Sequence, residues 1–104
     1  MVYVSAIELL YFLRLNMLDD DVEKVFHFTS SNFYLTFKFS HNEMSAIDNK
    51  TNSKVIQEKW LYMQEFVSAT AKLLKENPLP TNDPVFNDLT ESINDAIGFI
   101  QKYQ

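Results

Sequence analysis

The side chains of this chain that could do chemistry are two histidines and scattered carboxylates. His27 and His41 could meet Glu43 and Asp48 to hold a metal ion or to act as an acid and base pair. No spacing requires that meeting, and the chain lacks the H-E-x-x-H motif that places two imidazoles and a general base on one helix. We therefore expect solvated or hydrogen-bonded histidines, no metal site and no catalytic residues.

The low glycine content and the absence of cysteine exclude several classes of enzyme. The chain has one glycine, Gly98, within a helical pattern, and no cysteine. Phosphate-binding loops, dinucleotide fingerprints and nucleophile elbows all need glycines where the backbone turns sharply or approaches a phosphate. Without cysteine there is no thiolate nucleophile and no cysteine-based zinc site. We expect a non-enzymatic protein without a cofactor, and Gly98 reflects either a close helix approach or chance.

An acidic stripe of Asp88, Glu91 and Asp95 projects from one side of the last predicted helix. It is a solvated helix face, an imitation of a phosphate track that occupies a nucleic-acid-binding protein, or a group of carboxylates that attracts a divalent cation. The chain itself carries a formal charge of −5. Direct nucleic-acid binding is therefore not expected, because it requires clustered Lys and Arg that neutralise phosphates.

Size and composition indicate one globular domain covering residues 1–104, with nine Phe and five Tyr. Glu8 and Arg14 interrupt the apolar N-terminal stretch before it reaches the length of a membrane span, and no signal-peptide pattern is present. We expect a cytoplasmic protein with no membrane partner. The abundance of Asn and Lys, with Arg14 as the single arginine, indicates an AT-rich genome such as that of a low-GC bacterium or its phage.

The first predicted helix begins at Ala6 after a capping box formed by Ser5 and Glu8, and it runs to Leu18, with residues 1–4 extended. Phe12 lies among its polar residues, as a partly covered aromatic or as a partner contact. Arg14 lies among its apolar residues. It either extends along the helix to solvent or makes a buried ion pair or an anion contact.

A Phe-rich β-hairpin is predicted over residues 22–40, because apolar and polar residues alternate there. Pairing Phe28 with Phe33 leaves a four-residue loop. One face of this hairpin carries nearly all of its Phe side chains. This Phe face should lie on the central helix, since a two-stranded ribbon needs cover. Tyr34 then points outward, and an uncovered strand edge could pair with another chain.

Three more helices are predicted. A short helix over residues 41–49 follows a second capping-box spacing at Ser40 and Glu43, and a long central helix covers residues 53–77. The last helix begins with Asp83 as its cap and Pro84 at its first position. The central and last helices should form an antiparallel αα-hairpin.

The predicted fold is therefore α+β: an N-terminal helix, a Phe-rich antiparallel hairpin, a short helix and a long αα-hairpin. The leading functional hypothesis is a non-enzymatic interaction protein, of inhibitor, adaptor or immunity type, that occupies a partner protein or a second copy of itself. Two alternatives stay open: an acidic nucleic-acid mimic, and a domain that holds an apolar small ligand between the Phe face and the helices. Candidate protein-binding residues are Phe12, Tyr34, Leu61 and Tyr62.

Overall fold

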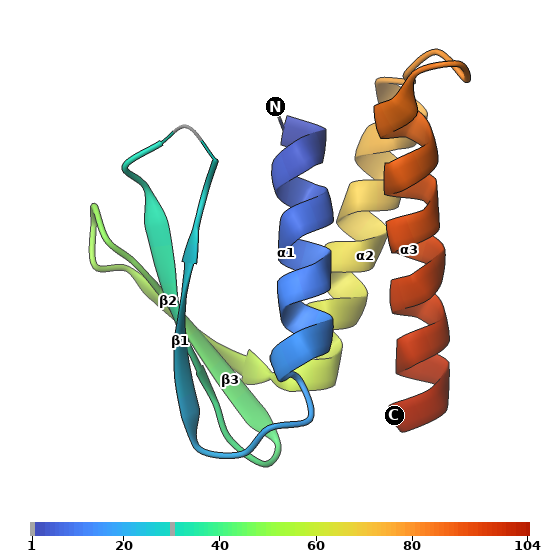
Figure 1. Ribbon diagram of the computed structural model, residues 1–104. Coiled ribbons are helices and arrows are strands. Elements are labelled where there is room, and N and C mark those ends of the chain that lie inside the picture. Colours follow the sequence, from blue (N-terminus) through green and yellow to red (C-terminus); the bar gives the residue numbers. More distant parts are fainter. Residues whose placement is uncertain (1, 30) are drawn as a thin grey trace.

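Strand-type alternation in the middle of the chain lies between helical periodicity at both ends, and the computed structural model shows the same division (Figure 1). It describes residues 2–29 and 31–104. The fold is α+β, as predicted, with three helices and one four-stranded sheet in the described residues. The elements are α1 (Val2–Asn16), β1 (Val22–His27), β2 (Tyr34–Phe39), β3 (Glu43–Asp48), β4 (Lys54–Glu58), α2 (Lys59–Glu76) and α3 (Pro84–Tyr103).

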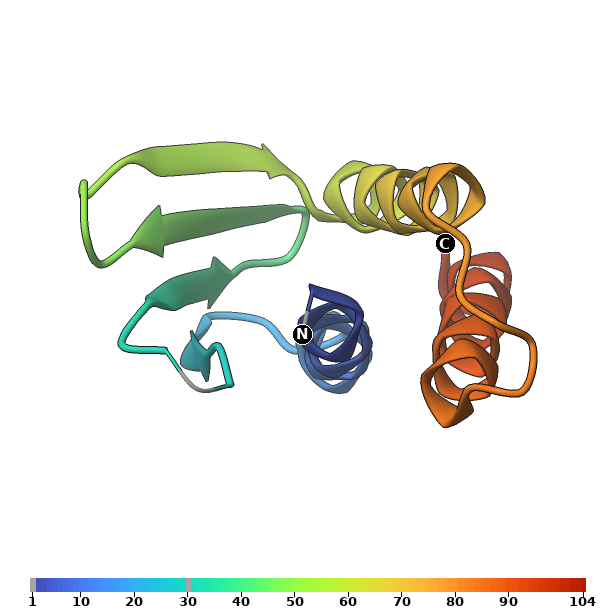
Figure 2. The same cartoon turned by 90° about the horizontal axis from the view of Figure 1, so that it is seen from above.

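The strands form an antiparallel meander in the order β1-β2-β3-β4, so each strand pairs with its neighbour in sequence. Figure 2 shows all three helices on one side of the sheet. The face toward the helices carries the buried side chains Phe26, Phe37 and Phe39. The opposite face is open, and Val25 on it is 47% exposed. One apolar and one open face are usual for an antiparallel sheet.

The predicted hairpin is confirmed, including its register. His27 pairs with Tyr34, and the ladder continues to Phe28, whose N–H donates to the carbonyl oxygen of Phe33 at 3.2 Å. The rings of Phe28 and Phe33 lie 5.1 Å apart. Aromatic cross-strand pairs stabilise a hairpin end, which explains why a loop without glycine suffices here.

The predicted short helix over residues 41–49 is wrong, because this segment forms strand β3. Ser40 and Glu43 instead close the tight turn between β2 and β3, where the Ser40 N–H donates to the Glu43 carbonyl oxygen at 2.9 Å. The side chains of Met44 and Ala46 are buried beside Phe39 and Phe37 in the ladder. The same three-residue spacing serves a helix cap or a two-residue hairpin turn, and strand pairing decided between them.

The central helix starts later than predicted, because residues 54–58 form the edge strand β4. A turn at Asp48 precedes this strand, with Asn52 at a positive φ of 58°. Glu58 ends the strand and caps α2, where its carboxylate accepts the N–H of Leu61 at 2.7 Å. Strand and helix therefore meet without a linker.

Helix α1 also differs from the prediction at its beginning. It is already helical at Val2, so the extended segment predicted over residues 1–4 is wrong for Val2 onward, and Met1 lies outside the described residues. Glu8 does not close a capping box. Its carboxylate accepts a hydrogen bond from the Thr29 hydroxyl at 2.5 Å, in the loop between β1 and β2.

The last helix is as predicted: the Asp83 side chain accepts the N–H of Val85, and Pro84 occupies the first turn. In Figure 1, α2 and α3 run antiparallel and are joined by residues 77–83. A methyl group added at Gly98 would meet nothing within 4 Å. Gly98 therefore does not serve a close approach of helices within the described residues.

The core is centred on α1, although the sequence indicated α2. Leu10, Leu13 and Met17 are fully buried, each contributing about 1.5–3 kcal/mol on burial. Phe12 covers the Phe face of the sheet, at 5.3 Å from both Phe26 and Phe37 between ring centroids. The prediction that α2 covers this face holds in part, for Tyr62 at its first turns. No helix within residues 2–29 and 31–104 has the length and apolar character needed to cross a bilayer.

Candidate functional site

The outer side of α1 exposes a row of large apolar side chains. Tyr11 and Leu15 on the helix and Leu18 in the turn after it have 56%, 59% and 51% of their surface exposed. Tyr11 and Leu15, at i and i+4, lie on one line of the helix, and Leu18 continues this spacing at i+7 into the turn that follows. We call Tyr11, Leu15 and Leu18 the outer stripe. Single exposed apolar residues are ordinary, whereas an aligned set is a candidate interaction surface.

Arg14 connects the outer stripe to α3. Its guanidinium lies 5.6 Å from the centre of the Tyr11 ring and 4.0 Å from the Asp95 carboxylate. Its side chain is 29% exposed, while its Nε atom is buried and has no hydrogen-bond partner among the described residues. Arg14 therefore combines a partly covered ion pair with cation–π contact, rather than extending freely into solvent.

The acidic stripe lies beside this surface. Asp88, Glu91 and Asp95 are all exposed on α3, and Asp95 faces Arg14 of α1. The pairing with Arg14 reduces the charge that Asp95 presents outward. Through Arg14, Asp95 therefore places one carboxylate next to the apolar outer stripe.

Two of the predicted protein-binding residues meet inside the fold. Phe12 of α1 and Tyr62 of α2 contact the same ring, that of Phe37, at centroid distances of 5.3 and 6.2 Å. Both are half-buried. Burial raises the pKa of the Tyr62 phenol above its ordinary value. These two side chains support the sheet and helix packing, and their role in binding a partner stays a prediction.

The other two predicted residues lie apart from each other. Leu61, on α2, is 44% exposed, whereas Tyr34 is half-buried on the open face of the sheet, where its ring contacts His27 at 5.3 Å. The structure thus does not gather the four predicted residues into one patch. The edge strand β4 exposes Val55 and Ile56 by 52% and 59%, so its edge is open to pairing with another chain.

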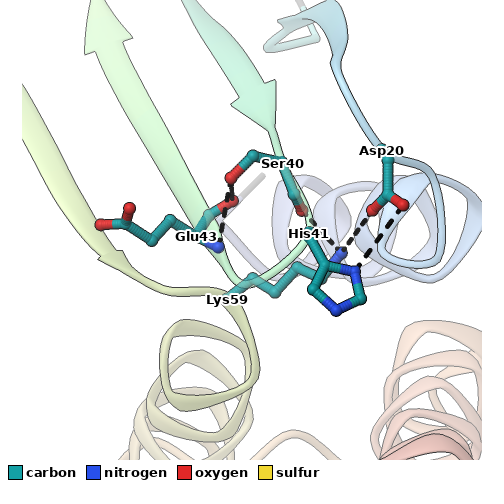
Figure 3. A network of polar contacts seen from close by, with 5 residues as sticks. All are labelled: Asp20, Ser40, His41, Glu43 and Lys59. Atoms are coloured by element: carbon teal, nitrogen blue, oxygen red, sulfur yellow. Dashed lines mark hydrogen bonds and ion pairs between the residues drawn. The ribbon is translucent and has the colours of Figure 1, made fainter.

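A polar junction holds the sheet to the helices at the end where β2 turns into β3 (Figure 3). Lys59 is 4% exposed, and its ammonium donates to the Ser40 carbonyl oxygen at 2.9 Å and lies 3.9 Å from the Asp20 carboxylate. His41, which is largely exposed, lies 3.7 Å from the same carboxylate. We call Lys59, Asp20 and Ser40 the lysine junction. It joins the α1–β1 loop and the β2–β3 turn to the first residue of α2, which gives it a structural role.

The histidines do not meet. His27 is on the outer face of the sheet and His41 is in the β2–β3 turn, at the lysine junction. In the part of the chain that the structure describes, no three His, Asp or Glu side chains are grouped in a way that could hold a metal ion. Neither histidine has the partners of a general base aimed at a pocket.

At the opposite end of the sheet an apolar groove separates the sheet from the helices. It has a volume of about 710 Å³ and lies between the β1–β2 hairpin, α1 and α2. Its walls include Leu9, Phe28, Phe33, Tyr62, Phe66 and Leu73. A smaller hollow of about 280 Å³ lies near the β2–β3 turn, with Glu23, Lys38 and Lys54 among its lining residues.

Comparison with family models, curated proteins and solved structures found no match to this chain. The arrangement of residues is therefore the evidence for function. Among the predicted residues, Tyr62 lines the groove and Asp95 borders the outer stripe. The outer stripe itself was missed: Tyr11, Leu15 and Leu18 share a helical spacing, but that spacing does not show that this side of the helix stays uncovered.

Proposed function

We propose that the protein is a non-enzymatic interaction protein that occupies the surface of a partner protein, with α1 as its contact element. The observation that carries this proposal is the outer stripe. Its three large side chains are more than half exposed, on a helix whose other side is fully buried. The domain already has its core from Leu10, Leu13 and Met17, so the outer stripe is available to a partner.

The chemistry of this surface indicates the kind of partner. Apolar anchors at i, i+4 and i+7 on a helix fit an apolar groove of another protein. Asp95 of α3 lies beside the stripe through its contact with Arg14, and Asp19, Asp20 and Asp21 follow directly after the stripe in the sequence. We therefore propose a partner whose groove has a basic rim, since complementary charges speed association and fix its orientation.

The nucleic-acid mimic is less well supported. A phosphate imitation needs a run of free carboxylates, whereas Asp95 is paired with Arg14 and the neighbouring surface is apolar. Its binding would weaken steeply with added salt. Binding through the outer stripe depends mainly on apolar burial and weakens little.

The test is a matched pair of substitutions, Leu15→Lys and Ile56→Lys. Both side chains are 59% exposed, one in the outer stripe and the other on edge strand β4, and neither contributes to the buried core. Wild-type protein and both variants are used to capture partners from a lysate of the native cell. The bound protein is identified, and its affinity is then measured with purified components. Leu15→Lys should weaken binding by roughly 30-fold or more, as expected for a central anchor, and Ile56→Lys by less than about threefold.

Light scattering distinguishes a second copy of this chain from a different protein as the partner. A second copy of this chain gives a dimer mass that Leu15→Lys returns to the monomer. Loss of binding in Ile56→Lys but not in Leu15→Lys would move the contact to the sheet edge and refute the role of α1. A strict monomer that captures no specific protein would refute the proposed function.

A further inference from the structure

The groove at the open end of the sheet is held in place by hydrogen bonds between its walls. The Thr29 hydroxyl of the hairpin loop donates to Glu8 of α1, and the Tyr3 hydroxyl of α1 donates to the carbonyl oxygens of Leu73 and Asn77 at the end of α2, at 3.1 and 2.7 Å. Each bond joins α1 to another wall. The groove is thus formed by the fold itself, and its volume lies within the range of small-molecule sites.

The lining is apolar and uncharged. Aromatic side chains from two elements, Phe28 and Phe33 from the hairpin and Phe66 from α2, face the same space, and none of the described residues that line it is a Lys, Arg, His, Asp or Glu. An anionic headgroup placed here would lose its hydration without gaining a counter-charge, which is costly. The lining therefore selects uncharged ligands over fatty acids or phosphate esters.

The groove also offers a hydrogen-bond donor. Tyr62 lines it, and its phenol carries an O–H group that can donate. Burial raises the pKa of this phenol, so it stays protonated at neutral pH and can donate. Thr70, another lining residue, already uses its hydroxyl to donate to the Phe66 carbonyl oxygen at 2.8 Å. A bound molecule with an acceptor group can thus be oriented by Tyr62.

We propose that this groove binds a small, uncharged, mainly apolar molecule whose hydrogen-bond acceptor is held by the Tyr62 phenol. The site is separate from the outer stripe of α1, and this inference does not rest on the proposed protein partner. A protein segment docked in the groove is the competing occupant, and the experiment below distinguishes the two.

The experiment compares two naphthalene fluorophores with purified protein. Prodan is uncharged and carries one ketone acceptor, whereas anilinonaphthalene sulfonate has a similar apolar body with a negative charge. Prodan should bind saturably with one molecule per chain, and the sulfonate should bind at least tenfold more weakly. Equal binding of both probes would show a general apolar surface and overturn the proposal.

Two substitutions on α2 test whether Prodan binds in the groove. Ala69 lines the groove and Ala71 does not, although both are exposed on α2. Ala69→Trp should abolish Prodan binding by filling the groove, and Ala71→Trp, the same substitution two residues later, should leave it unchanged. Because neither alanine is buried, both variants should keep the fold, which circular dichroism and urea unfolding verify.

Tyr62→Phe tests the donor. Removal of one hydrogen bond should weaken Prodan binding by about three- to tenfold while sulfonate binding stays the same. Unchanged Prodan affinity would refute the role of Tyr62. If Ala69→Trp leaves Prodan binding intact but abolishes capture of a protein partner, the groove takes a protein segment and the small-ligand proposal is wrong.

Discussion

The two ends of the sheet are attached to the helices in opposite ways. At one end the lysine junction joins two loops to the start of α2 through a single buried ammonium group, and at the other the sheet and helices stand apart around an apolar groove. Hydrogen bonds have a defined length and direction, so a few of them fix a junction closely. At the groove the bridging hydrogen bonds, such as Thr29 to Glu8, are exposed, and the apolar side chains between the walls leave space for another molecule.

The largest expected effect is at the lysine junction. Lys59→Ala removes the buried aliphatic stem and leaves the Ser40 carbonyl oxygen without its donor, so the free energy of unfolding should fall by about 2–4 kcal/mol. Urea unfolding measures this. Lys59→Met, which keeps the stem, should recover roughly half of the loss. A loss below about 1 kcal/mol in Lys59→Ala would show that the junction does not hold the sheet.

The end of the sheet that borders the apolar groove should tolerate substitutions better. Leu73 lines the groove and is 37% exposed, so Leu73→Ala should lower the free energy of unfolding by only about 1–1.5 kcal/mol, as part of its surface is already in water. The same urea titration compares it with Lys59→Ala. A cost equal to that of Lys59→Ala would mean that the two ends do not differ.

A position outside both ends of the sheet gives a reference value for these changes in the free energy of unfolding. Gly98 is an exposed residue within α3, and an added methyl group would meet nothing within 4 Å. Gly98→Ala should therefore raise the free energy of unfolding by about 0.5–1 kcal/mol through helix propensity alone. A decrease in thermal midpoint would reveal a contact of Gly98 with a second molecule.

The smallest effect should appear at high pH. Burial raises the pKa of Tyr62 above its ordinary value of 10.0. A group whose pKa is raised on folding stabilises the fold below its unfolded pKa, and this contribution is lost as the pH rises through the folded pKa. Wild type should thus lose stability relative to Tyr62→Phe above about pH 10. Parallel pH dependence of the two proteins would show that the Tyr62 phenol stays hydrated in the folded protein.

The hairpin and α3 could be predicted because their signals are local. Phe alternation set the register of the hairpin as far as Phe28 and Phe33, and Asp83 with Pro84 specified where α3 begins. Strand β3 could not be separated from a helix, because Met44 and Ile47 have helical spacing while Met44 and Ala46 have the two-residue spacing of a strand. Pairing with β2, a tertiary contact, decided the matter.

The candidate site was harder to predict than the fold. A helix that is apolar on all sides gives no indication of which side will be covered. In α1 that choice depends on where α3 packs, and it leaves Tyr11 and Leu15 outside. The groove depends on the distance between the sheet and α2, a quantity that no local pattern encodes. Tyr62 was singled out as a surface residue, yet its ring belongs to the wall of the groove.

The packing of α1 against α3 also has a consequence for the order in which the domain can be assembled. During synthesis α3 leaves the ribosome after every other element of this domain, so the side of α1 that packs on α3 stays uncovered until α3 has been made. Until then α1 presents apolar residues on both of its sides. The nascent chain is therefore most prone to aggregate just before α3 emerges, and it is then that a chaperone would act.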